Sequence, residues 1–450
     1  PAHIVPLYLA HSAAHSVTHH VHTSGRDGVM YGAGGDRCHR RVDNGGASPS
    51  TSLERRSSDL PTVSTMYGPQ GWADLPDALL HSIASLLVSF PDLLAFTATC
   101  PSWRAAFSSY PSESGLSSLL PPLLIQPDVP LCSPQPRPYS SSLVPRRPCH
   151  ATNLASQSMY MCCQIPLFCH FGNRNGLPCP LDKFIFIGAS YGHLILSNKQ
   201  SGLVVAVAVV DVFTGLSVSP PQLPVPVDED NQFYHATLTA PLVSPNSHLM
   251  VTTRSYNFFW RVGSDSWVRG SKRYKPIRRV VVFKGQVFGT HNNCELFTVH
   301  LVPRIRIQKI AVDLGESEMF NRPHFFHTWL VACGDMLLMV GCPRSSPSTE
   351  GTFEAFRLDL SPEPAKWVKV KKLGNWAIFI SVDERSQALC CMDPERWGGR
   401  RNCIYCYDSN KWIACKLGKP LQRGASSRRF NYGSIMQPMW VVPSMLYPCP

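Results

Sequence analysis

A serine between two glycines is the first group in this 450-residue chain whose residue types and spacing could support catalysis. Gly188-Ala-Ser190-Tyr-Gly192 has the Gly-x-Ser-x-Gly spacing of the turn that exposes a nucleophilic serine in hydrolases. That chemistry needs a helix directly after the turn, to orient the hydroxyl and supply an N–H to the oxyanion. The next residues, His193-Leu-Ile-Leu-Ser197, alternate and predict a strand, so we expect Ser190 to lie in a hairpin without a catalytic role.

Two other groups have residue types that could bind a metal. Cys403-x-x-Cys406 has zinc-ligand spacing, but the segment predicts a strand, on which positions three apart point to opposite faces. His11, His15 and His19 would share one face of a helix, but nothing around them builds a site. The chain also lacks a phosphate-binding glycine loop with its lysine and a dinucleotide fingerprint. We therefore expect no metal and no cofactor.

A run of basic residues is the remaining candidate for binding chemistry. Its seven members fall within sixteen positions with no acidic residue between them: Arg269, Lys272, Arg273, Lys275, Arg278, Arg279 and Lys284. The run predicts either a patch for nucleic acid or an acidic partner, or a solvated loop and strand face. Within it, we consider Lys272, Arg273 and Lys275 candidates for binding a target protein. Residues 151–450 hold 32 basic and 20 acidic residues, so the whole formal charge of +12 resides there.

The apolar runs and the cysteines of the chain indicate where in the cell the protein resides. No apolar run reaches the roughly 18 residues that a membrane-spanning helix needs. The opening segment 4–10 lacks a basic flank and contains a proline, which argues against a signal peptide. The 17 cysteines are odd in number and scattered, which suggests reduced thiols. We expect a cytoplasmic or nuclear protein that makes no membrane contact.

From about residue 160, short apolar runs alternate with turn residues and predict an all-β region over 160–420. Turns are predicted at Lys284-Gly285 and Gly334-Asp335, among others. Trp267, Trp367 and Trp412 recur at near multiples of a 40–50-residue unit, a period that fits four-stranded propeller blades. A β-propeller is therefore our first interpretation and a large sandwich the alternative.

Residues 71–110 predict three short helices. Apolar residues follow a helical spacing from Leu79 to Leu87, and Pro91 and Pro101 each open a further helix. About forty residues cannot enclose so many large apolar groups by themselves. Part of that surface must be buried against the rest of the chain or against another protein.

The same stretch closely resembles an F-box. Trp72-Ala-Asp-Leu75-Pro76-Asp-Ala-Leu79-Leu80 and Cys100-Pro-Ser-Trp103-Arg104 carry the resemblance. The F-box is the helical module through which substrate receptors dock on the Skp-type adaptor of cullin-based ubiquitin ligases. The resemblance implies an adaptor-binding face with these members: Leu75, Pro76, Leu79, Leu80, Ile83, Leu94, Cys100 and Trp103. The alternative is an amphipathic hairpin that packs only on its own domain.

The region from about residue 180 to residue 415 resembles the C-terminal domain of a large plant family of F-box proteins. That domain is propeller-like and its function is unknown. The matching segments are 211–215 with 220–224, 353–359 with 366–367, 373–379, and 402–408. The chain departs from the family at Asp211, where an Asn-Pro turn is usual.

These interpretations predict an α+β multidomain protein with five regions. They are a low-complexity, unfolded tail (1–65), the F-box (71–110), a proline-rich linker (111–155) that separates it from the rest, the propeller-like domain (160–420) and a C-terminal tail (421–450). Met66 is a plausible true start, since the chain begins at Pro1.

The resemblances imply a substrate receptor of a Skp-cullin-F-box ubiquitin ligase, which is itself not an enzyme. Its partners would be the adaptor, through it a cullin, and a target protein. The alternative is a nucleic-acid-binding or nuclear regulatory protein that uses the basic C-terminal region.

Overall fold

A computed structural model describes most of the chain from residue 71 to residue 447. The described ranges are 71–110, 116–127, 148–154, 159–164, 184–200, 204–224, 235–271, 276–291, 294–323, 326–343, 352–381, 383–408, 411–419 and 438–447. The tail predicted over 1–65, with its histidines and Met66, and the candidate residues Lys272, Arg273 and Lys275 lie outside them.

The N-terminal described segment forms a compact helical module. It contains a 3-10 turn, η1 (Trp72–Asp74), and the helices α2 (Asp77–Leu86), α3 (Phe90–Thr99) and α4 (Pro101–Ser108). Ser89 caps α3, since its hydroxyl oxygen accepts a hydrogen bond from the Asp92 N–H. The prolines stand in the first turns of α3 and α4, where a missing N–H costs nothing. Leu80, Ala84, Phe96 and Ala106 form the module's own small core.

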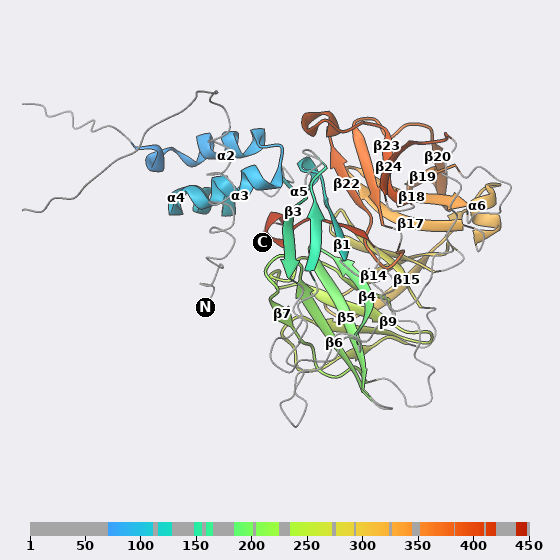
Figure 1. The fold of residues 1–450 in the computed structure, drawn as a ribbon. Helices are drawn as coiled ribbons and strands as arrows, with labels where there is room; N and C mark the ends of the chain where they lie inside the picture. The colour runs from blue at the N-terminus through green and yellow to red at the C-terminus, as the bar shows by residue number, and fades with distance from the viewer. Residues whose placement is uncertain are drawn as a thin grey trace, which may run out of the picture.

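The remaining strands form a six-bladed β-propeller (Figure 1). Blade 1 contains β1 (Leu123–Pro127), β2 (Pro148–Thr152), β3 (Met159–Gln164) and β25 (Met439–Val441), and blade 2 contains β4 (Phe184–Ser190), β5 (His193–Gln200), β6 (Val204–Asp211) and β7 (Ser217–Val218). Blade 3 contains β8 (His235–Leu238), β9 (His248–Thr252), β10 (Asn257–Arg261) and β11 (Val268–Arg269), and blade 4 contains β12 (Arg279–Phe283), β13 (Gln286–Thr290), β14 (Leu296–His300) and β15 (Arg306–Ile310).

Blades 5 and 6 depart from the simple four-stranded meander. Blade 5 contains β17 (Phe326–Cys333), β18 (Met336–Pro343), β19 (Glu354–Asp359) and β20 (Ala365–Val370), with the two-residue strand β16 (Val312–Asp313) added in parallel at its outer edge. Blade 6 has the order β22-β21-β23-β24, from β21 (Trp376–Ile380), β22 (Leu389–Met392), β23 (Cys403–Asp408) and β24 (Lys411–Lys416). The short helix α5 (Leu116–Leu119) lies between α4 and β1, α6 (Glu318–Asn321) and η5 (Pro394–Trp397) lie between strands, and η6 (Ser444–Leu446) follows β25.

The propeller prediction is confirmed, and the tryptophan period reflects the blade repeat. Trp367 and Trp412 lie on β20 and β24, and Trp267 directly precedes β11, so each marks the fourth strand of a blade. The predicted Lys284-Gly285 turn closes the β12–β13 hairpin with positive φ at both residues, 50° and 73°. Each junction between neighbouring blades contains one apolar cluster, so the core is a ring of six interfaces rather than one centre.

Blade 1 closes the ring by joining the two ends of the described chain. Its innermost strand, β25, pairs with β1, and Leu124 stands opposite Trp440. The sequence interpretation differs from the structure at both ends, because β1 and β2 fall within the predicted linker and β25 within the predicted tail. These strands are only three to five residues long and two contain proline, so their local pattern resembles that of a linker.

The helical module packs directly on the propeller, on the left side of the view in Figure 1. Phe90 and Leu93 of α3 are buried in the cluster that also contains Leu123, Ile125 and Met439 of blade 1. The Arg396 guanidinium donates a hydrogen bond to the Ser85 carbonyl at the end of α2. The expectation that a linker separates the module from the propeller is therefore wrong: burial of the second helix removes that separation. In the described part of the chain, no helix has both the length and the apolarity to cross a membrane.

Candidate functional site

One side of α2 presents large apolar side chains to solvent. Leu79 is 52% exposed and Leu86 is 74% exposed, and the two are seven residues apart on one face of the helix. Trp72, in the preceding 3-10 turn, is 77% exposed, and Pro76 is exposed between them. Leu79, Leu86, Trp72 and Pro76 are called the α2 surface below. An apolar surface of this kind on a small module is typical of a contact with another protein.

The predicted adaptor residues divide between this surface and the interior. Pro76 and Leu79 lie on the α2 surface, whereas Leu80 is fully buried in the module's own core. Leu94 is half-buried and packs against the cluster that joins the module to the propeller. The remaining four are half-buried: Leu75, Ile83, Cys100 and Trp103. Leu80 is therefore corrected to a structural residue, because its side chain is fully enclosed by the module. Leu94 and the other half-buried residues stay predicted adaptor residues.

Trp103 has a structural role that the sequence did not reveal. Its indole Nε1 donates a hydrogen bond to the Trp72 carbonyl oxygen at 2.8 Å, and its ring lies 4.7 Å from that of Phe96. Trp103 thereby holds the 3-10 turn against α4. Sequence reasoning omitted Trp72 and Leu86 from the contact set, although the spacing of Leu86 from Leu79 was a usable signal.

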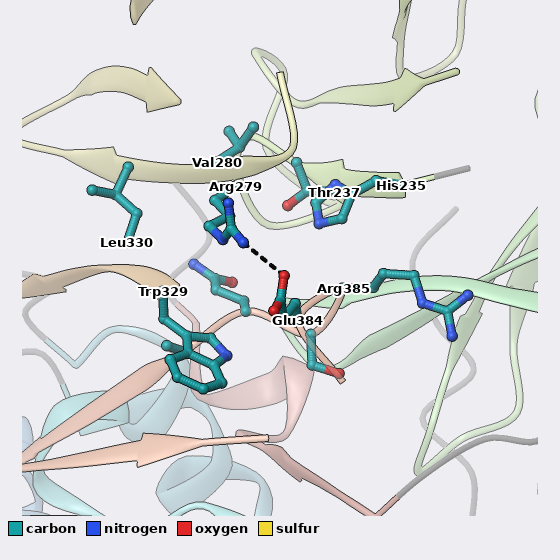
Figure 2. Close-up of a pocket in the computed structure, with 11 residues that line it drawn as sticks. His235, Thr237, Arg279, Val280, Trp329, Leu330, Glu384 and Arg385 are labelled. Carbon is teal, nitrogen blue, oxygen red and sulfur yellow. Dashed lines mark hydrogen bonds and ion pairs between the residues drawn. The ribbon is translucent and has the colours of Figure 1, made fainter. Parts of the chain in front are cut away.

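A second candidate is a pocket at the centre of the propeller (Figure 2). It is bordered by His235, the first residue of β8, by Arg279, the first residue of β12, and by Trp329 of β17. Segment 384–388, before β22, supplies the other side. Since β8, β12 and β17 are the innermost strands of their blades, the pocket, called the axial pocket below, lies near the propeller axis.

Ion pairs between blades build the walls of the axial pocket. Arg279 Nη2 lies 2.6 Å from Glu384 Oε2, and Glu384 Oε1 lies 2.5 Å from His327 Nδ1. Arg385 pairs with Asp383 at 2.6 Å, and Figure 2 shows its guanidinium directed away from Arg279. Burial, together with the positive charges of Arg279 and Arg385, lowers the pKa of His235 to about 3, so its imidazole is neutral at physiological pH.

The basic run is divided by the structure. Arg269 is exposed and lies over the Tyr256 ring, and Lys284 is exposed at a hairpin turn. Arg279, in contrast, is buried and donates to the Thr328 carbonyl as well as to Glu384. Arg278 is half-buried, and burial with the charge of Arg279 lowers its pKa. The interpretation of the whole run as a solvated face is therefore wrong for Arg279, which is buried, whereas Arg278 is half-buried beside it.

The Ser190 region forms a hairpin, as expected. β4 is followed by β5, and the Ser190 hydroxyl oxygen accepts a hydrogen bond from the Leu238 N–H at 2.8 Å. His193 and Asp211 lie nearby, but His193 Nδ1 donates to the Tyr191 carbonyl and Nε2 faces Asp211 at 3.9 Å. Neither ring nitrogen is directed at Ser190, so the three residues do not form a nucleophile with its base. His193 and Asp211 face each other within blade 2, and Ser190 joins blade 2 to blade 3.

The two cysteines with zinc-ligand spacing point to opposite sides of β23, as predicted. Cys403 belongs to the apolar cluster between blades 6 and 1, and Cys406 packs against the cluster between blades 5 and 6. Among the described residues, no three His, Cys, Asp or Glu side chains come close enough together to hold a metal ion.

The architecture defines the class of protein as a six-bladed β-propeller with a helical module docked on it. The chain belongs to the KIB1-4 beta-propeller family, whose sequence profile matches residues 168–429, more than half of its length. No curated protein matches the sequence.

Two solved structures show only weak similarity. One is the N-terminal domain of Nup159, at 10% identity and a TM-score of 0.29, with 50% of this chain and 56% of that chain covered. The other is Bacteroides ovatus Xyloglucan PUL GH43B, at 13% identity and a TM-score of 0.19, with 40% and 39% covered. The chain thus spans little more than half of the first structure.

Proposed function

We propose that this chain is a substrate receptor of a Skp-cullin-F-box ubiquitin ligase. The observation that carries the proposal is the α2 surface, where Leu79 and Leu86 face solvent immediately after the Leu75-Pro76 opening of the F-box-like sequence. Leaving two leucines exposed seven residues apart on one helix makes physical sense when a partner covers them, since each buried leucine stabilises a complex by about 1.5–3 kcal/mol. The resemblance of the C-terminal region to propellers that follow an F-box supports the same assignment.

The proposed mechanism is positional. The helical module holds the adaptor, the propeller holds a target, and the ligase raises the local concentration of a charged conjugating enzyme near the target's lysines. Direct packing of Phe90 and Leu93 on blade 1 supports a fixed distance between the two binding surfaces. No residue of this chain takes part in bond making in this proposal.

The target surface is proposed on the end of the propeller away from the helical module. Phe213, in the β6–β7 turn, touches Phe90, so the module lies at the end where the first and third turns of blades occur. Because blade strands alternate in direction, β11 ends and β12 begins at the opposite end. Lys272, Arg273 and Lys275 fall between these two strands in the sequence, outside the described residues, and we propose them as part of the target surface.

The alternative, a nucleic-acid-binding protein, is less well supported. It uses the basic C-terminal region, but Arg279 of the basic run is buried and paired with Glu384, and Arg278 is half-buried. The proposal has a direct test in co-purification of the full chain with a Skp-type adaptor. Leu79→Ala combined with Leu86→Ala should reduce adaptor binding at least tenfold, since each lost leucine contact removes about 1.5–3 kcal/mol.

Leu360→Ala combined with Leu216→Ala is the matched control for this test. Leu360 is 53% exposed and Leu216 is similarly exposed, but both lie on propeller turns. The control should bind the adaptor normally. Equal adaptor binding by the two double variants would exclude the α2 surface as the docking site, and no adaptor binding by the unmodified chain would refute the receptor proposal.

A further inference from the structure

We propose that the axial pocket is a binding site for a small oxyanion, a phosphate or carboxylate group. The inference goes beyond the receptor role, because it concerns the propeller alone and requires neither adaptor nor target. It rests on the unpartnered polar atoms of the pocket, on its charges and on its size.

The pocket contains polar atoms without a partner in the described part of the chain. Trp329 is only 7% exposed, yet its indole Nε1 has no hydrogen-bond acceptor. Figure 2 shows that nitrogen on the side of the ring that faces Glu384. Gln387 Oε1 is also buried without a partner. Buried polar groups nearly always have partners, so two unsatisfied atoms in one pocket indicate a ligand or ordered water.

The amide of Gln387 can supply a donor instead of an acceptor. Its side chain hydrogen-bonds with the Tyr191 hydroxyl, which can either accept or donate. The oxygen and nitrogen of an amide are assigned from the network around them, so a rotated amide directs its NH₂ into the pocket and accepts from Tyr191. The NH₂ group would then join the Trp329 N–H as a donor, and Thr237 and Ser386 are also among the residues that line the pocket.

The charges around the pocket favour an anion. Arg278, Arg279 and Arg385 stand against two carboxylates, Asp383 and Glu384. Glu384 pairs with Arg279 and Asp383 pairs with Arg385, so Arg278 supplies the one positive charge in excess. Arg279 has five N–H donors, of which its bonds to Thr328 and Glu384 use two. A further acceptor with negative charge would therefore find donors that are already oriented.

The volume restricts the ligand to a small group. A water-sized sphere can reach a volume of only about 20 Å³ inside the axial pocket, little more than one water molecule needs. A nucleotide or sugar chain is therefore too large, and the pocket can take at most one group of a few heavy atoms, such as a carboxylate or a phosphate. A water molecule is the competing occupant, and it would satisfy Trp329 and Gln387 without requiring any charge.

Thermal denaturation of the purified full chain in the presence of an anion tests the proposal. Sodium phosphate and sodium acetate are titrated separately, each against sodium chloride at the same ionic strength. Binding to the folded state should raise Tm progressively with concentration of the oxyanion and not with chloride. If phosphate binds at least tenfold more tightly than acetate, the ligand is a phosphate group. If acetate binds as tightly as phosphate or more tightly, the ligand is a carboxylate.

Two variants assign the effect to the pocket. Trp329→Phe keeps an aromatic ring and removes the N–H. It should reduce the affinity for the anion about tenfold, as expected for loss of a hydrogen bond to a charged acceptor. Trp367→Phe is the matched control, since Trp367 is 4% exposed and its Nε1 is equally unpartnered, but it lies in the cluster between blades 4 and 5. This control should bind like the unmodified chain.

Gln387→Glu provides an independent variant if Trp329→Phe does not fold. It is nearly the same size and adds a negative charge, so it should abolish oxyanion binding, while a water molecule would still be accepted. Absence of any oxyanion effect beyond that of chloride would show a water-filled cavity and overturn the proposal. Equal Tm shifts in the unmodified chain and in Gln387→Glu would show a non-specific effect on a basic protein, which also overturns it.

Discussion

Phe90 of α3 lies against Phe213 of the β6–β7 turn, with ring centroids 5.6 Å apart. This contact joins the second helix of the module to blade 2, while Leu93 on the same helix enters the blade 1 cluster. The helical module is therefore part of the propeller's packing and not a separate body on a tether. Any partner on α2 is held at a set orientation to the propeller axis.

The first prediction concerns this junction. Phe90→Ala should lower the free energy of unfolding by about 3–5 kcal/mol, because it removes a buried ring and leaves a cavity between module and propeller. Leu86→Ala, on the exposed face of the neighbouring helix, should change it by less than about 0.5 kcal/mol. Urea denaturation measures both variants. Equal stabilities would mean that the module does not contribute to the propeller's core.

The second prediction separates two adjacent leucines. Leu80→Ala should cost about 2–5 kcal/mol of stability, since Leu80 is fully buried in the module. Leu79→Ala should leave stability nearly unchanged and affect only adaptor binding. Thermal denaturation together with an adaptor pull-down distinguishes them. If the Leu80 variant kept normal stability and lost adaptor binding, the correction of Leu80 to a core residue would be wrong.

The third prediction concerns acid sensitivity. The pKa of His235 is about 3 in the folded chain and near its ordinary 6.5 when unfolded, so below pH 6.5 the unfolded state takes up a proton that the folded state refuses. Stability should therefore fall as pH decreases from 6.5 towards 3, by about 1.4 kcal/mol per pH unit for this residue. Burial also lowers the pKa values of His193 and His248, which act in the same direction.

The variant His235→Gln should lose less stability on acidification than the unmodified chain. The fall in the free energy of unfolding per pH unit should be smaller by about 1.4 kcal/mol, the contribution of one proton, as measured by urea denaturation between pH 7 and pH 5. His300→Gln is the control, because His300 is exposed at the end of β14. A slope that does not change in His235→Gln would show that His235 takes up its proton equally in both states.

The fourth prediction concerns ring closure. A Cβ at Gly192, whose φ is +80°, would lie 2.4 Å from the Ser444 backbone nitrogen. Gly263 has a similar φ of +85°, but a Cβ there meets nothing within 4 Å. Gly192→Ala should therefore lower Tm clearly more than Gly263→Ala, since both suffer the same backbone strain and only the first displaces the C-terminal segment. Equal Tm values would indicate that this segment moves aside without cost.

The fifth prediction concerns target capture, with a target first identified by proximity labelling while the ligase is inhibited. Reversal of Lys272, Arg273 and Lys275 to glutamate should slow capture of an acidic target at low salt, and the defect should shrink as salt screens the charges. Adaptor binding is the control and should not change. If target capture responds neither to the charge reversal nor to salt, these residues do not bind the target and are only a solvated face.

Local patterns in the sequence determined the parts of this protein that depend on neighbouring residues. The prolines and the apolar spacing predicted the helices near 71–110, and the turn at Lys284-Gly285 and the tryptophan period predicted strands in propeller blades. The opposite orientation of Cys403 and Cys406 followed from strand geometry alone. All of these features arise from hydrogen bonds and side-chain directions within a few residues.

Tertiary structure alone decided which apolar residues remain exposed and which charges are buried. Leu79 and Leu80 look equivalent on a helical face, but only packing against Phe96 and Ala106 selects Leu80 for the core. The pairing of β25 with β1 joins residues more than 300 positions apart, and the ion pair between Arg279 and Glu384 joins two blades. Such contacts depend on closure of the ring, and no local periodicity encodes which distant segment will become the neighbour.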